Sequence, residues 1–185
     1  PVMLTDIPEY NFQAFIQEPH KRKAVHAFSE DAAAKVHRFH SQLPGYMPTQ
    51  LVSLKGLAGS WGLGDILVKD ESTRFDLKAF KVMGGSYAVA CLVCRELGLG
   101  IEEIDYSRLV SDDVRRQIKH MTLTTATDGN HGRGIAWAAE QLGLNAVIYV
   151  PKGTAPSRIE NIRSHGAVVE VTDLNYDDAV RLASS

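Results

Sequence analysis

The second half of the sequence alternates between short apolar runs and amphipathic stretches, and this alternation constrains the fold more than any other feature. The runs are rich in β-branched residues and predict strands, while the stretches have the apolar spacing of helices. In chain order, the predicted strands and helices are 121–126, 132–143, 146–151, 157–166, 167–171 and 175–185. Because such alternation is typical of parallel strands joined by right-handed helical crossovers, we expect a doubly wound α/β fold.

A less regular pattern precedes this region. Ser29 is a candidate N-cap for an amphipathic helix that stops at Pro44. We then expect a short extended segment and a further set of elements before the regular region begins. That set comprises a helix at about 51–58, a strand at 65–70 and an apolar helix over 86–100.

Composition and charge narrow the kind of ligand. The chain has 185 residues, of which 44% are hydrophobic, so it can bury a core. Its net charge of −2 and pI of about 6.4 provide no broad basic surface for nucleic acid or anionic lipid. The sequence also has no run of membrane-spanning length and no signal-peptide pattern at its start. We therefore expect a cytoplasmic protein that binds a small molecule, with no nucleic-acid or membrane partner.

Cysteine and histidine supply two candidate sites of another kind. Cys91 and Cys94 form a C-x-x-C pair, but the pair falls within an apolar helical pattern, which favours buried helix residues over redox chemistry. His37 and His40 lie three residues apart on the predicted first helix, with His20 and His26 upstream. No carboxylate or thiolate at suitable spacing joins the histidines, so we expect no metal site.

The stretch "KAFKVMGGS" places Lys81 among apolar residues directly before two glycines. Burying an unpaired lysine is costly, and a lysine in an apolar setting tends to become a neutral, nucleophilic amine. Lys81 is therefore a candidate for covalent attachment to a carbonyl compound. The alternative is a surface lysine at the start of a helix.

A second candidate site is the loop "TDGNHGRG", which follows the strand at 121–126. In an α/β sheet, the carboxyl end of a strand and the N-terminus of the next helix attract anions. Glycines allow close backbone approach, and Asn130 adds an amide, so the loop is suited to a carboxylate or oxyanion. A plain strand-to-helix turn, capped by Asp128 and Asn130, is the alternative.

Several motifs together resemble one enzyme family. They are "VKDESTRFDLKAFKVMGGS", "TATDGNHGRGIAWAA" and "VIYVPKGTAPSRIENIRSHGAVVE", in this order. The set is similar to the fold type II pyridoxal phosphate enzymes, the group of tryptophan synthase β and threonine dehydratase. Within this group, the forms "RFDLKAFKVMGG" and "TDGNHGRGIAWAA", with "YMPTQL" upstream, resemble the diaminopropionate ammonia-lyase subgroup. The likeness runs from about Tyr46 to the last residue, with Gln50 in place of a second proline.

The resemblance implies roles for particular residues. Lys81 takes the position of the lysine that binds pyridoxal 5'-phosphate, whereas Lys78 does not. Asn130 matches the residue that contacts the 3-hydroxyl oxygen of the cofactor. Asp128 stands where the subgroup has an acid/base carboxylate. The substrate carboxylate loop comprises Thr127, Asp128, Gly129, Asn130 and His131.

The resemblance also implies an activity and an organisation. The activity is elimination from D- and L-2,3-diaminopropionate to pyruvate and ammonia, in amino-acid catabolism, by a homodimer when full length. Residues 1–82 are expected to begin the large cofactor-binding domain, and 83–185 to form most of the small parallel α/β domain. Because the family's second glycine-rich phosphate loop does not occur after Ala155, we expect an N-terminal portion that is inactive alone. Two alternatives stay open: a serine or threonine dehydratase, and a non-catalytic module that binds an anion at 127–132.

Overall fold

A computed structural model describes residues 29–127 and 129–183. Its first elements are α1 (Glu30–Ser41), β1 (Leu51–Ser53), α2 (Lys55–Ser60) and β2 (Leu67–Lys69). The connection to the second half contains a 3-10 turn, η2 (Arg74–Asp76), and three helices, α3 (Lys81–Glu96), α4 (Tyr106–Leu109) and α5 (Asp112–Ile118). The rest is β3 (Thr122–Ala126), α6 (Asn130–Leu142), β4 (Asn145–Pro151), α7 (Pro156–Arg163), β5 (Val168–Thr172) and α8 (Tyr176–Ala183).

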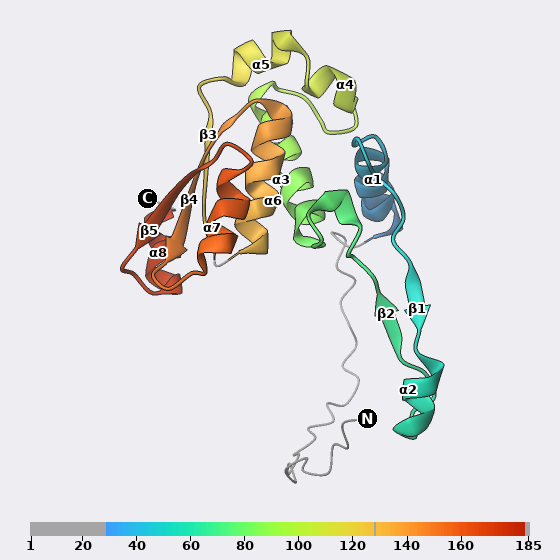
Figure 1. Ribbon diagram of the computed structural model, residues 1–185. Helices are drawn as coiled ribbons and strands as arrows, with labels where there is room; N and C mark the ends of the chain where they lie inside the picture. Colours follow the sequence, from blue (N-terminus) through green and yellow to red (C-terminus); the bar gives the residue numbers. More distant parts are fainter. Residues whose placement is uncertain (1–28, 128, 184–185) are drawn as a thin grey trace, which may run out of the picture.

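The alternating region forms the predicted parallel sheet. β3 pairs with β4 and β4 pairs with β5, both in parallel, so that the three strands lie in chain order. Helices α6 and α7 make the crossovers and pack on one side of the sheet, while α8 returns to contact β3 and β4 on the other (Figure 1). The prediction of a doubly wound α/β arrangement is confirmed.

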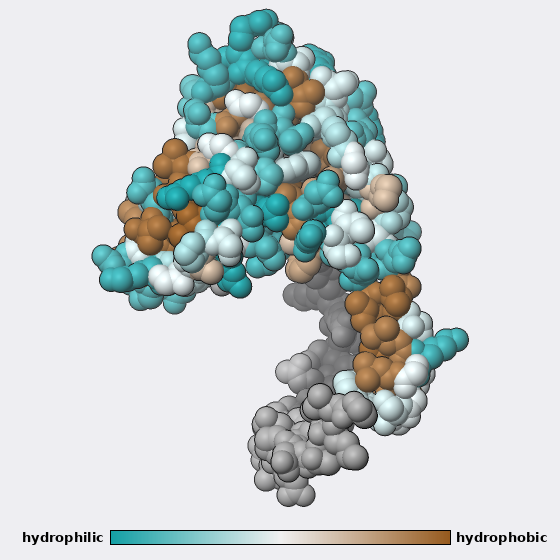
Figure 2. Space-filling view, in the orientation of Figure 1, coloured by the Kyte–Doolittle hydropathy of each residue, from teal (hydrophilic) through white to brown (hydrophobic). Residues whose placement is uncertain are grey.

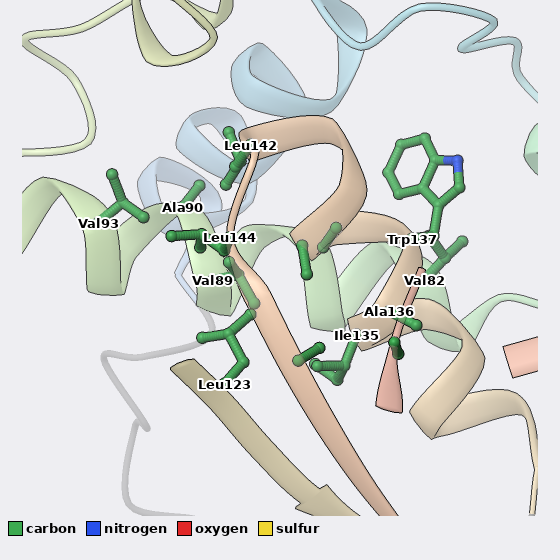
Figure 3. Close-up of a cluster of buried hydrophobic side chains, with 14 of the residues drawn as sticks. Val82, Val89, Ala90, Val93, Leu123, Ile135, Ala136, Trp137, Leu142 and Leu144 are labelled. Carbon is green, nitrogen blue, oxygen red and sulfur yellow. The ribbon is translucent and has the colours of Figure 1, made fainter. Parts of the chain in front are cut away.

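The core lies between this sheet and the helices that cover it. α3 packs along α6, and their shared apolar side chains include Val82, Val89, Val93 and Ile135 (Figure 3). Ile148 on the central strand is fully buried. Because a central strand covered on both faces buries both sets of its side chains, the continuous apolar run at 146–151 follows from this position.

The predicted first helix is confirmed as α1, where the Ser29 hydroxyl accepts a hydrogen bond from the Ala32 N–H at 3.2 Å. The predicted helix at 51–58 was wrong at its start. Leu51–Ser53 is a strand that pairs antiparallel with β2, and α2 begins only after Leu54. The β-branched Val52 pairs with Val68, 16 positions later, and this pairing outweighed the local helical pattern.

The predicted helix at 86–100 also began too late. α3 starts at Lys81 and contains Gly84 and Gly85, although glycine lowers helix propensity. The short helices α4 and α5 lie in a connection for which no element was predicted. In the part of the chain that the structure describes, no helix is long and apolar enough to cross a membrane.

Residues 51–69, which we call the arm, extend from the body of the molecule (Figure 1). They comprise β1, α2 and β2. Leu51, Trp61 and Leu67 are each more than half exposed there. The space-filling view shows this apolar surface as a continuous patch along the arm (Figure 2).

Candidate active site

A hollow of about 520 Å³ opens beside the beginnings of α3 and α6. It contains both candidate residues Lys81 and His131, which are 50 positions apart in the sequence. The lining residues are Glu71, Arg74, Phe80, Lys81, Met83, Gly84, Gly85, Ala88, His131 and Ile135. Four of them can be charged and most of the others are apolar, which is the composition of a small-molecule site.

Glycines bring the two helices close enough to form this hollow. A Cβ atom on Gly134 would lie 3.0 Å from the Val82 Cα atom and 3.4 Å from the Lys81 carbonyl carbon. A Cβ atom on Gly85 would lie 3.2 Å from the Ile135 Cδ1 atom. Any larger side chain at Gly134 would therefore press on the backbone of the first turn of α3. The close approach of α3 and α6 sets Lys81 beside the first turn of α6.

Lys81 is the first residue of α3, and its side chain is exposed at the hollow. The expectation that apolar neighbours enclose it was only partly right. Phe80 and Met83 line the hollow, but Val82 points into the core and is 1% exposed. Successive residues of a helix point in different directions, so the three neighbours cannot all surround one side chain. Lys81 makes none of the ion pairs between described residues.

The loop after β3 is tied together by Thr127. This residue is 2% exposed, and its Oγ1 atom accepts hydrogen bonds from the N–H groups of Gly129 at 3.0 Å and Gly132 at 3.2 Å. Its own N–H donates to the Tyr149 carbonyl on β4. Thr127 therefore connects the sheet to the start of α6. Because the Gly129 N–H is used within the loop, a substrate role for Thr127 and Gly129 stays a prediction.

The other loop residues differ in position. His131 lines the hollow with Lys81, whereas Asn130 is exposed at the first position of α6 and is not part of the lining. Asp128 lies outside the described residues. The first N–H groups of a helix have no acceptor within the helix, so this end of α6 favours an anion.

His131 is held in its neutral form. Burial lowers the pKa of its imidazole below the ordinary value near 6.5, and the nearby Lys81 ammonium lowers it further. A neutral imidazole has one nitrogen that donates and one that accepts a hydrogen bond. His131 can therefore orient a polar ligand at neutral pH without adding a second positive charge beside Lys81.

One charged cluster in the hollow was not predicted. Arg74 is 6% exposed and donates to Glu71 through Nε at 2.8 Å and to the Met47 carbonyl through Nη1 at 2.8 Å. Thr49 accepts from Arg74 Nη2 at 3.1 Å and donates to the Glu71 carboxylate. These bonds to Arg74 hold the pKa of the Glu71 carboxyl below its usual value. The spacing of an acid three residues before a base, as in "ESTR", is the only sequence signal for this cluster.

The remaining candidates behave as structural residues. Cys94 is buried, and burial raises the pKa of its thiol to about 11, so it has little thiolate character at neutral pH. This supports the interpretation of the C-x-x-C pair as helix residues. Within 29–127 and 129–183, no group of three or more His, Cys, Asp or Glu side chains is placed to bind a metal ion.

Comparisons with known proteins place this chain in an enzyme family. The family of pyridoxal-phosphate dependent enzymes matches residues 42–185. Diaminopropionate ammonia-lyase of Salmonella typhimurium is 47% identical over 178 residues, which cover 96% of this chain and 44% of that protein. This chain therefore spans less than half the length of that relative.

Solved structures show the same likeness. The apo form of diaminopropionate ammonia-lyase from Escherichia coli is 49% identical with a TM-score of 0.80, covering 88% of this chain and 43% of that one. The same enzyme in complex with an aminoacrylate-PLP azomethine reaction intermediate gives a TM-score of 0.77 at 48% identity, covering 88% and 39%.

Proposed function

Because this chain belongs to the family of pyridoxal-phosphate dependent enzymes, we propose that its protein removes ammonia from 2,3-diaminopropionate to give pyruvate. The observation that carries the proposal is the meeting of Lys81 with the first turn of α6 in one hollow. An amine nucleophile and an anion-binding helix start are the two groups that such a reaction requires. Identity of 47% to a diaminopropionate ammonia-lyase supports the choice of substrate.

The hollow is suited to pyridoxal phosphate. Lys81 is the residue that would hold the aldehyde carbon, and Phe80, Met83 and Ile135 offer apolar walls for a planar ring. Asn130 is the proposed contact for the 3-hydroxyl oxygen. When bound, this cofactor withdraws electrons from the substrate and so stabilises negative charge at Cα.

The residues of this chain then have separate tasks. The start of α6, with Asn130 and His131, binds and orients the substrate carboxylate. Lys81, through its free amine, can accept or return a proton at Cα. Asp128 is proposed as a second base, which takes the α-proton from the opposite face. The balanced reaction consumes one water molecule and yields one pyruvate and two ammonia molecules for each diaminopropionate.

The test is a substrate panel with the full-length protein and added cofactor. D- and L-2,3-diaminopropionate should each give pyruvate and ammonia in a ratio of one to two, faster than serine or threonine. A visible absorption band that disappears on borohydride reduction should accompany activity. Preference for serine or threonine would assign the protein to the dehydratases instead. A preparation with cofactor supplied, but with neither band nor product, would contradict an enzymatic role.

Asp128 is tested by Asp128→Asn. If it is the base for one isomer, this change should slow elimination from the D isomer by about a hundredfold to ten thousandfold and spare the L isomer. If the carboxylate only pairs with the β-ammonium group, KM should rise for both isomers while serine is unaffected. Unchanged rates for both isomers would remove Asp128 from the mechanism.

Two properties of the whole protein are proposed on the family resemblance alone. We expect a homodimer in the cytoplasm. The molecular mass of the full-length protein in solution, measured by sedimentation at micromolar concentration, tests the dimer. The mass of a monomer would contradict it.

A further inference from the structure

The backbone directly before Lys81 has an unusual conformation. Phe75, Asp76 and Lys78 have φ angles of 47°, 57° and 56°. They are the only non-glycine residues with positive φ in the described chain, and all three lie within the six residues before Lys81. A side chain with a Cβ atom crowds the backbone in this region, so each such residue is costly. Strain of this kind persists only where the surroundings hold it.

The surroundings of residues 75–78 come partly from α6. The Arg133 Nη1 atom donates a hydrogen bond to the Leu77 carbonyl at 3.1 Å. The Phe75 ring packs against Trp137, with ring centroids 5.0 Å apart, and the Leu77 side chain is 5% exposed. Helix α6 therefore holds this segment at its backbone and at its side chains.

The other end of the segment is held by Arg74. Its carbonyl accepts hydrogen bonds from the N–H groups of Leu77 at 2.9 Å and Lys78 at 3.3 Å. Its guanidinium lies over the Tyr46 and Phe75 rings, at 5.6 and 5.8 Å, and is fixed by the Glu71 pair described above. Because these contacts immobilise Arg74, the amides bonded to its carbonyl report the conformation of residues 75–78.

Arg133 also lies two residues after His131 on the same helix. One hydrogen bond thus links the helix that carries His131 to the segment that leads into Lys81. The Arg133 Nε atom is buried and has no hydrogen-bond partner among the described residues. Leaving a buried donor unpaired is unfavourable, so packing alone would be served better by an apolar side chain.

We propose that Arg133 is a positioning residue, which clamps the strained 75–78 segment and thereby sets the place of Lys81 relative to His131. The inference rests on the proposed role of Lys81 as the cofactor lysine. Without the clamp, the segment relaxes toward negative φ angles, and the start of α3 loses its fixed relation to α6.

Amide hydrogen exchange in the full chain without cofactor tests the clamp. Arg133→Met keeps the length of the side chain but removes the donor, and exchange of the Leu77 and Lys78 amides should become about tenfold faster. Arg133→Lys keeps a charged donor on a flexible chain and should retain part of the protection. Unchanged exchange in Arg133→Met would overturn the proposal.

Glycine substitution tests for backbone strain, because it should slow amide exchange at a strained position and speed it at an unstrained one. Asp76→Gly removes the Cβ atom at a position with positive φ, so it should slow exchange at Leu77 and Lys78 by a few-fold. Thr73→Gly is the matched control, because Thr73 is exposed and has an ordinary φ of −105°. There, glycine should only add freedom to the unfolded segment and speed exchange. Faster exchange in Asp76→Gly would show that the segment is not strained.

The consequence for Lys81 is measured by borohydride trapping with pyridoxal phosphate, followed by mass analysis of the peptide that contains Lys81. Arg133→Met should lower the trapped fraction several-fold, and adding Asp76→Gly should restore part of it. Equal trapping in parent and Arg133→Met would overturn the positioning role. Absence of trapping in every form, including the parent, would overturn the proposed function, while altered exchange would still support the clamp.

Discussion

The α3–α6 contact and the arm are both rich in glycine and apolar residues, yet the contact buries most of its apolar side chains while the arm leaves most of its large ones exposed. Val82 in α3 is 1% exposed, whereas Leu67 in the arm is 57% exposed. A Cβ atom on Gly134 would meet backbone at 3.0 Å, whereas one on Gly56 in α2 would meet nothing within 4 Å. The same residue types therefore serve close packing in one region and a local turn or strand in the other.

The two regions also depend on contacts between residues at different distances along the chain. The arm is held by pairing between neighbouring strands, which depends on nearby sequence. The contact between α3 and α6 joins residues about 50 positions apart, and it places Lys81 at the candidate site. Substitutions in the two regions should therefore change the free energy of unfolding by different amounts. For glycine substitutions, the two changes should have opposite signs.

The largest contrast is expected from side-chain truncation. Ile148→Ala empties a fully buried position on the central strand and should lower the free energy of unfolding by about 2 to 5 kcal/mol. Leu67→Ala in the arm should change the free energy of unfolding by about 0.5 kcal/mol or less, because the Leu67 side chain buries little apolar surface. Urea denaturation measures both. Similar losses would show that the arm is packed in solution.

Replacing a glycine with alanine should have opposite effects on stability in the two regions. Gly134→Ala presses a methyl group onto the Val82 backbone and should destabilise by about 1 to 3 kcal/mol. Gly56→Ala meets no neighbour and gains helix propensity, so it should stabilise by up to about 1 kcal/mol. Both positions are helical, so thermal unfolding of the two variants isolates the effect of the contact. Stabilisation by Gly134→Ala would contradict the close approach of α3 and α6.

The smallest expected effect on stability comes from the contact of α1 with the first turn of α3. The buried His40 Nε2 donates to the Met83 carbonyl at 2.8 Å. Burial lowers the pKa of His40 below its ordinary value near 6.5, against the opposing effect of that carbonyl, and Arg74 lowers it further. The unfolded chain therefore binds the proton more readily, so stability should be retained above pH 6.5 and decrease as the pH falls below it.

Urea midpoints at pH 7.5 and 5.5 measure this dependence. The decrease should be smaller in His40→Gln than in the parent. His37→Gln alters an exposed histidine on the same helix, which has the smallest of the effects on the His40 pKa, so this control should keep most of the parental pH dependence. A decrease of the same size in His40→Gln would place the responsible group elsewhere.

Much of the body was predictable from the sequence, because each strand and helix there carries its own periodic pattern. The runs at 121–126 and 146–151 read as strands, and both are strands of the parallel sheet. Lys81 and His131 were each recognised as candidates from local motifs. Their meeting in one hollow was expected only from the family resemblance, since local patterns do not contain the contact between α3 and α6.

Other features lay beyond sequence reasoning for physical reasons. Leu51–Ser53 depends on a strand that follows 14 residues later in the chain, so its local pattern was misleading. The positive φ angles of Phe75, Asp76 and Lys78 are imposed by tertiary contacts, and no glycine marks them. Arg133 carried no signal, because its partner is a backbone carbonyl 56 positions away.

The central claim is that Lys81, and not Lys78, is the cofactor lysine. The two lie three positions apart, but only Lys81 is part of α3 and lines the hollow. The most direct measurement is borohydride trapping of pyridoxal phosphate on the full-length protein, with mass analysis of the labelled peptide. Lys81→Ala should abolish both the label and elimination, while Lys78→Ala should leave both largely intact. Equal losses from the two changes, or a label that persists in Lys81→Ala, would contradict the assignment.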